Sequence, residues 1–511
     1  MSQTIDPTVS SPALDSALAW LAQPSAEDPL RDLVPLRSHL AAVDDMGVAP
    51  LQLLRILELF QPRVNAVNTV LKPLLRDAAL PVDRRLRTIA QGLLDVHGRI
   101  AAAYSKVMLE ADGKRLQTLH RNPTSLCALA LGNLLQQMEV SLLVSAAAPP
   151  DMWRHAQAVY HWTMAAVPHD STLPEGANAV LRHFQTMLAL AAAQPESFTP
   201  AEIDFLLVYL REHASQLELA DALPTTSSKK TWYWVNEERD HVPCAVVRRA
   251  PPEVARNVCF SCHELGRSAL EQVEHLEAGE TPQALGVDAR AADPALRQAL
   301  QRAASRWTQP PKRHTARHGS SSRVQVCTDL PALWRYQRGA APSATNADGV
   351  TATNWMMLNE SAGGLAIMHV SGDIHGIAAG SALAVQPTTE QPWGLYLVRW
   401  ARSDNPEHLE LGLELVAQAG EAVRLVRHGS RDGMTAEDVT IEAFRLPPLP
   451  ATKRGEALLA APGIHRSGTF TLVSENAERI QLTDCTPGNL LLQTASVELF
   501  EFTRDFSPAG L

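Results

Sequence analysis

The pattern of apolar and polar positions divides the chain into two parts with different periodicities. From about residue 16 to residue 222, apolar residues recur near the 3.6-residue period of amphipathic helices. From about residue 322 onward, short segments alternate apolar with polar residues, as half-buried strands do. The sequence therefore predicts an α-helical N-terminal part followed by a β-rich C-terminal part.

The first part is predicted to contain successive helices with short connections. One apolar helix face is formed by Leu51, Leu54, Ile56, Leu57 and Phe60. Further helices fit residues 125–147, 151–166, 176–194 and 200–218. The last of these begins at 199–202, where threonine can cap the helix, proline occupies its first turn and glutamate closes a capping box. This organisation is typical of a helical bundle or repeat array, and no fixed period indicates a named solenoid.

A change in composition follows the helical part. Residues 225–230 form a Ser/Thr/Lys linker, and a small mixed segment is predicted after it. In that segment strands fit 232–235 and 245–247, and helices fit 262–278 and 293–307. Two prolines at 310–311 end it, because proline cannot continue a helix. Later strands are predicted at 323–326, 395–400, 409–415, 468–472 and 497–502, with a long Ser/Ala/Gly/Asn loop at 339–352.

Composition and charge limit the class of protein. A length of 511 residues is enough for roughly three or four domains. The net charge of −10 argues against a general nucleic-acid-binding protein, although a local basic pocket remains compatible with it. The N-terminus does not have the pattern of a secretory signal, and no window has 18 uninterrupted apolar residues. We therefore expect a cytoplasmic protein without membrane insertion and without a nucleic-acid polymer as partner.

Two short motifs carry the functional prediction. Arg313 and Arg317 are four residues apart and precede the first predicted strand of the β-rich part. Asn359, Ser361 and Gly364 form an N-x-S-x-x-G element between two strand-like segments. In this order the two motifs resemble the signature of PilZ domains, small β-barrels that commonly bind cyclic di-GMP. The later segments 398–400 and 411–415 also resemble strands of that family, so the resemblance covers about residues 311–418.

The resemblance implies a cyclic di-GMP site formed by these five residues. An arginine guanidinium can donate two hydrogen bonds to guanine O6 and N7, or bind a phosphate, and its flat face stacks on a purine. Asn359 can donate and accept hydrogen bonds at a guanine edge, and Ser361 adds a hydroxyl. The residues 318–358 that separate the two motifs number 41, more than is usual in the family.

A second cluster of residue types could bind a metal instead. His241 and Cys244 are followed by Cys259 and Cys262, a spacing compatible with a structural zinc site. Cys259 to His263 also matches the C-x-x-C-H of haem attachment, a reaction that normally occurs outside the cytoplasm. Independent buried cysteines explain the same residues more simply, so we expect no metal and no cofactor.

These observations predict a multidomain α+β protein. We expect a flexible tail (1–15), a helical domain (16–222), a mixed segment (223–310), a PilZ-like barrel (311–420) and a β-rich module (421–511). The predicted function is a non-catalytic cytoplasmic cyclic di-GMP receptor whose helical domain binds an unidentified protein partner. Two alternatives remain open: a PilZ-like scaffold that binds no nucleotide, and an enzyme with an unrecognised site in the helical domain.

Overall fold

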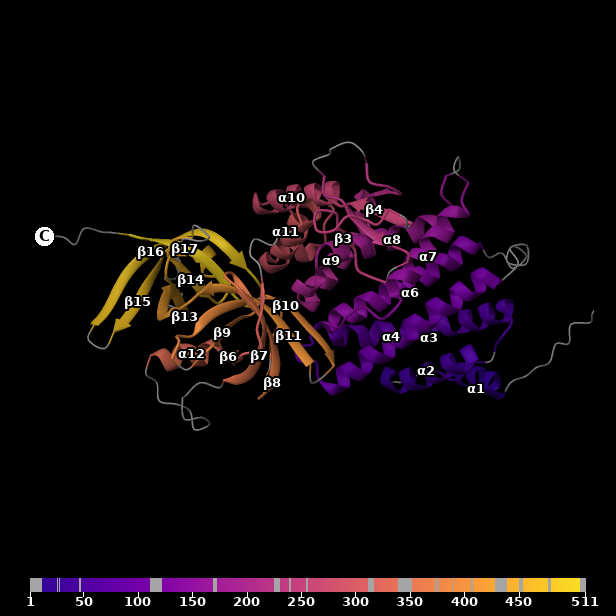
Figure 1. Ribbon diagram of the computed structural model, residues 1–511, viewed down its shortest axis with the longest axis horizontal. Coiled ribbons are helices and arrows are strands. Elements are labelled where there is room, and N and C mark those ends of the chain that lie inside the picture. Colours follow the sequence, from indigo (N-terminus) through magenta and orange to yellow (C-terminus); the bar gives the residue numbers. More distant parts are fainter. Residues whose placement is uncertain are drawn as a thin grey trace, which may run out of the picture.

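The structure is a computed structural model that describes most of the chain between residues 12 and 505. The residues not described within this span are 25, 27, 46, 111–121, 169–171, 225–229, 239, 254–255, 311–316, 339–351, 373, 375, 389, 406–407, 428–438, 450–453 and 477–478. The helical array lies at one end of the molecule and two β-barrels at the other (Figure 1). This arrangement confirms the predicted order of a helical part, a PilZ-like barrel and a second β-module.

The helical array consists of long helices joined by short connections. The bounds are α1 (Pro12–Leu21), α2 (Pro29–Asp45), α3 (Pro50–Arg76), α4 (Arg84–Glu110), α6 (Pro123–Leu143), α7 (Met152–Ala165), α8 (Glu175–Ala192) and α9 (Pro200–His213). The predicted capping box at the start of α9 is present. The Thr199 hydroxyl accepts from the Glu202 backbone N–H at 3.3 Å, and the Thr199 N–H donates to the Glu202 carboxylate at 2.8 Å.

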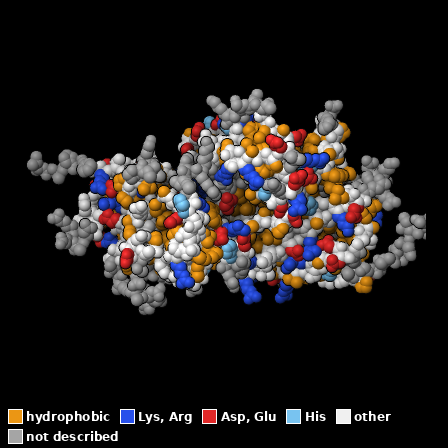
Figure 2. Space-filling view, viewed as in Figure 1, with side chains coloured by type: hydrophobic (Ala, Val, Ile, Leu, Met, Phe, Trp, Pro, Cys, Tyr) orange, Lys and Arg blue, Asp and Glu red, His pale blue; other side chains and the backbone are white. Residues whose placement is uncertain are grey.

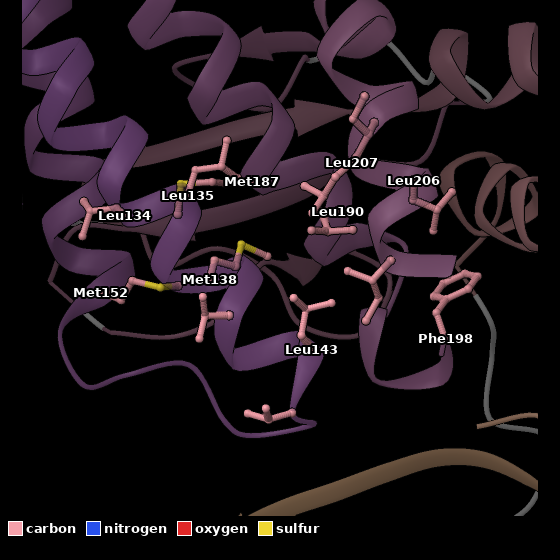
Figure 3. Close-up of a cluster of buried hydrophobic side chains, with 14 of the residues drawn as sticks. Leu134, Leu135, Met138, Leu143, Met152, Met187, Leu190, Phe198, Leu206 and Leu207 are labelled. Atoms are coloured by element: carbon pink, nitrogen blue, oxygen red, sulfur yellow. The ribbon is translucent and has the colours of Figure 1, made fainter. Parts of the chain in front are cut away.

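Helix α6 is the centre of the array. Its Leu134, Leu135 and Met138 lie among Met187 of α8, Leu207 of α9 and other apolar side chains (Figure 3). The helix is long and apolar enough to cross a membrane, but 72% of its most apolar window is buried inside the protein. Its apolar surface therefore faces other helices, as in a core helix.

A small mixed unit follows the array. Its sheet has the strand order β1–β4–β2–β3, built from β1 (Glu218–Ala220), β2 (Tyr233–Asn236), β3 (Cys244–Ala245) and β4 (Asn257–Ser261). The helix predicted over 200–218 ends early because residues 218–220 pair with β4 instead. Two helices complete the unit, α10 (His263–Glu277) and α11 (Pro294–Thr308). Trp307 of α11 is fully buried and donates its indole N–H to the Ala189 carbonyl at 2.8 Å, which fixes α11 on α8.

The first barrel is a closed ring of six strands. Its strands are β6 (Arg323–Cys327), β7 (Thr353–Ser361), β8 (Gly364–Ser371), β9 (Ala382–Gln386), β10 (Gly394–Asn405) and β11 (His408–Ala417). The ring closes because β7 pairs with both β6 and β8, and β8 pairs with β11. A short strand, β5 (His318–Gly319), pairs with residues 359–360 of β7, beyond residues 353–356 that pair with β6.

The second barrel is also closed, and it contacts the first. Its strands are β12 (Glu421–Arg427), β13 (Val439–Leu446), β14 (Ala457–Ala460), β15 (Phe470–Asn476), β16 (Arg479–Gln493) and β17 (Glu498–Arg504). Helix α12 (Leu330–Gln337) lies in the unusually long interval between the two sequence motifs. Trp334 of α12 is buried between the barrels and donates to the Val423 carbonyl at 2.8 Å, and Arg338 forms an ion pair with Glu475. The described part of the long interval therefore joins the two barrels.

The first barrel contacts the helical array through the end of β10. Arg87 of α4 is buried and donates to the Ser403 carbonyl at 3.1 Å and to its hydroxyl at 2.9 Å. The Ser403 N–H donates to the Ser145 carbonyl at 2.8 Å, and the Ala147 N–H donates to the Asp404 carboxylate at 3.1 Å. Acidic and basic side chains are interspersed over the face of the molecule shown in Figure 2.

We predict that Arg87→Met loosens this contact. The change would leave buried acceptors on Ser403 without their donor, at a cost of about 1–3 kcal/mol. Amide hydrogen exchange in β10, followed by mass spectrometry, should accelerate roughly tenfold or more. Arg85→Met is the matched control, because Arg85 is exposed on the same helix. Equal exchange in the two variants would contradict a stabilising role for Arg87.

Candidate functional site

The N-x-S-x-x-G element is a tight hairpin between β7 and β8. Ser361 pairs with Gly364, and Glu360 pairs with Leu365, so only two residues form the turn. The Ser361 hydroxyl donates to the Gly364 carbonyl at 3.1 Å across this turn. The motif therefore presents short polar side chains at the edge of the first barrel.

The close approach of strand β11 explains the glycine at position 364. A Cβ added there would lie 2.0 Å from the Leu413 carbonyl oxygen and 3.1 Å from the Glu414 Cα. The Leu415 N–H also donates to the Gly363 carbonyl at 2.9 Å. The hairpin is thus held against β11, and Gly364 is required by that contact whatever else it does.

Asn359 has an unused hydrogen-bonding group. Its side chain is half-buried, and its Oδ1 is buried without a hydrogen-bond partner among the residues that the structure describes. A buried acceptor without a donor costs roughly 1–3 kcal/mol, so such groups in proteins often mark a place where another molecule binds. A guanine N–H is a donor of the right kind for this oxygen.

Strand β5 brings the arginine motif to the same hairpin. His318 pairs with Glu360 and Gly319 pairs with Asn359. Because the strands are antiparallel, the exposed Arg317, which precedes His318, lies beside Ser361, which follows Glu360. Arg313 lies outside the described residues. Of the five predicted site residues, the structure therefore brings four to one edge of the barrel: Arg317, Asn359, Ser361 and Gly364.

A β-bulge adds a third arginine that the sequence analysis did not assign to the site. Val398 pairs with Leu413 and Trp400 with Gly412, so Arg399 between them has no cross-strand partner. The Arg399 Nε lies 2.8 Å from a carboxylate oxygen of Glu414, and both side chains are about half exposed. Bulges often redirect a side chain next to a functional site. Segment 398–400 was matched to a family strand, but its arginine was not interpreted.

Tyr396 is a second residue near the hairpin that the sequence did not reveal. Burial raises the pKa of its hydroxyl, and the negative charge of Glu360 raises it further, so the two residues are close. Glu360 belongs to the hairpin strand β7, opposite His318. An aromatic ring near this turn could stack on a nucleobase.

The four residues proposed as a zinc site are not brought together. Strand β2 separates β3 from β4, so that Trp234 pairs with Cys244 on one side and with Cys259 on the other. Burial raises the pKa values of Cys259 and Cys262, which disfavours the thiolate that zinc binds. These cysteines and His241 form no metal-binding group. Among the residues that the structure describes, no group of three or more His, Cys, Asp or Glu side chains could hold a metal ion.

Comparison with known protein families identifies two consecutive domains. Residues 15–225 match the N-terminal domain of the cyclic-di-GMP receptor FimW, and residues 334–421 match the middle PilZ domain of the same receptor. The chain therefore contains a PilZ domain of the kind found in that receptor, preceded by a domain similar to the receptor's N-terminal domain. Its PilZ match contains the N-x-S-x-x-G hairpin and Arg399, but it begins after Arg317 and ends where the second barrel begins. No curated protein matches the chain.

We predict that Gly364→Ala destabilises the PilZ barrel. The new methyl group would overlap the backbone of β11, and overpacking of this kind costs about 1–3 kcal/mol or more. The midpoint of urea unfolding, followed by tryptophan fluorescence, should fall. Gly363→Ala is the control, since nothing lies within 4 Å of a Cβ at that position. A similar loss in both variants would show that the turn, and not the contact with β11, requires glycine.

Proposed function

We propose that this protein is a non-catalytic cytoplasmic receptor that binds cyclic di-GMP at Arg313, Arg317, Asn359, Ser361 and Gly364. The observation that supports it best is the pairing of β5 with β7, which brings Arg317 beside the hairpin that contains Asn359 and Ser361. The family match, whose printed description is a cyclic-di-GMP receptor, supports the same ligand.

The residue types fit the two chemical parts of the ligand. Arginines can bind a phosphate with two parallel hydrogen bonds or stack on a guanine. Asn359 Oδ1 is free to accept from a guanine N–H, and the half-exposed Arg399 adds positive charge beside Gly364. No cofactor or metal is required for this binding.

Strand β10 connects the proposed site with the helical array. Its bulge at Arg399 lies near the hairpin, and its end at Ser403 and Asp404 is hydrogen-bonded to residues of α4 and of the connection after α6. A ligand that orders the arginine segment or moves β10 would change the position of the array relative to the barrel. The array would then present or withdraw a surface for a protein partner.

The alternative is a PilZ-like scaffold that binds no nucleotide and acts only through protein–protein contacts. It predicts that Asn359 Oδ1 is unpaired merely because water reaches it, and that variants of the arginine motif change nothing but surface charge. An enzymatic function would need converging titratable groups in a pocket of the helical array.

We predict measurable heat when cyclic di-GMP is titrated into the wild-type protein. Arg317→Ala and Ser361→Ala should each weaken binding, the arginine variant by roughly ten- to a hundredfold, because a good bidentate contact is worth about 1–3 kcal/mol. Arg211→Ala, at an exposed position on α9, is the control and should bind like wild type. Absence of heat with folded wild-type protein would favour the scaffold. Unchanged binding by Arg317→Ala would show that the site lies elsewhere.

A further inference from the structure

A cleft of about 720 Å³ lies where α11 meets both barrels. Its walls are formed by one face of α11, by β10 and β11 of the PilZ barrel, and by β16, β17 and nearby residues of the second barrel. In Figure 1, α11 lies beside the region where the two barrels adjoin. A volume of this size is within the range of about 300–1,000 Å³ that ligand sites occupy.

The lining of the cleft is more positive than the protein as a whole. Four arginines and two glutamates line it, whereas the complete chain has a net charge of −10. Burial, together with repulsion from Arg399 and Arg302, lowers the pKa of Arg306 to about 10, although the negative charges of Glu196 and Glu202 oppose this shift. These three guanidinium groups, from two different elements, are therefore close enough to repel one another, while Glu202 and Glu414 pair with two of them.

Two of the arginines have unused hydrogen-bond donors. Arg302 Nη2 binds Glu202 at 2.8 Å, but its Nη1 is buried without a partner among the described residues. Arg454 donates to the carbonyls of Val416 and Pro447, while its buried Nε has no hydrogen-bond partner among the residues that the structure describes. Buried donors of this kind favour an anion that can accept from them.

The cleft adjoins β11, the strand against which the N-x-S-x-x-G hairpin is held. Glu414 lines the cleft and pairs with Gly364, and the neighbouring Leu415 is hydrogen-bonded to Gly363. Gln309 at the end of α11 also lines the cleft, four residues before Arg313. Strand β11 therefore borders both the hairpin and the cleft.

We propose that this cleft is the second half of the nucleotide site, closed on its far side by the C-terminal barrel. This proposal rests on the proposed cyclic di-GMP function. A phosphodiester group of the ligand takes the place of the Glu414 carboxylate on Arg399, and Leu491 of β16 contacts the ligand from the second barrel. The C-terminal barrel is then part of the receptor site and not only a packing support for the PilZ barrel.

The Arg399–Glu414 pair has the properties that such an exchange needs. Both side chains are about half exposed, at 42% and 52%, so their attraction is weakened by solvent and the pair opens at little cost. Glu414 holds the guanidinium in the cleft when no ligand is present, and its negative charge opposes any phosphate that enters. The ligand-free site would therefore be occupied by an internal carboxylate.

The decisive experiment places a bulky side chain in the cleft from the second barrel. Leu491→Trp should weaken cyclic di-GMP binding about tenfold or more in calorimetry, because the indole would fill space that the ligand needs. Leu482→Trp is the matched control: Leu482 is exposed on the same strand, at 67%, but does not line the cleft. Wild-type affinity in Leu491→Trp would overturn the proposal.

A second variant tests the cleft by a change that is expected to strengthen cyclic di-GMP binding. Glu414→Gln removes the competing carboxylate, so binding should tighten by about threefold or more, and Arg399→Ala should weaken it. Unchanged or weaker binding by Glu414→Gln would also overturn the proposal. If wild type gives no heat, both the receptor function and the cleft fail. If Arg317→Ala loses binding while Leu491→Trp and Glu414→Gln bind like wild type, the receptor function stands and only the cleft is wrong.

Discussion

The bulge at Arg399 is the constraint on which the contacts of strand β10 depend. Val398 pairs with Leu413 and Ala401 pairs with Leu411, so two residues three positions apart project to the same face of the sheet. In a regular strand, residues three apart project to opposite faces, because side chains alternate. The extra residue therefore lets β10 bury Val398 and Ala401 in one core while Arg399 reaches Glu414 in the cleft.

Because of this bulge, one strand contributes to three contacts of different kinds. Leu395 and Leu397 pack in the core shared with the second barrel, Arg399 lines the cleft, and Ser403 accepts two hydrogen bonds from Arg87. Burial lowers the pKa of Arg87, and the negative charge of Asp404 partly opposes that effect. Arg87 Nη1 and Nη2 donate to Ser403, whereas its Nε is buried without a partner among the described residues, so the two bonds to Ser403 offset only part of the cost of removing this guanidinium from water.

The sequence predicted local features better than contacts between distant segments. The capping box at Thr199 and the alternation in 323–326 follow from residues that are neighbours in sequence, and both are present. The helix over 200–218 was too long because residues 218–220 pair with a strand about forty positions away, which no local pattern records. Likewise, the spacing of the arginines at 302 and 306 indicates only that they share one face of a helix. Only the packing of α11 against α8 and the barrels places them in a cleft.

The electrostatic requirement of cyclic di-GMP is consistent with the proposed site at an interface of an acidic protein. Two phosphates need several positive groups close together. Like charges repel one another, and a carboxylate or carbonyl oxygen beside each guanidinium reduces this repulsion. In this protein the partners of the arginines come from separate units. Glu202 of the helical array forms an ion pair with Arg302, and Glu414 of the PilZ barrel forms one with Arg399. Backbone carbonyls between the barrels accept hydrogen bonds from Arg454. The positive cleft can therefore exist only when all three units are assembled. If the cleft binds the nucleotide as proposed, its affinity is coupled to the arrangement of the units, since whatever separates the units also disperses the arginines.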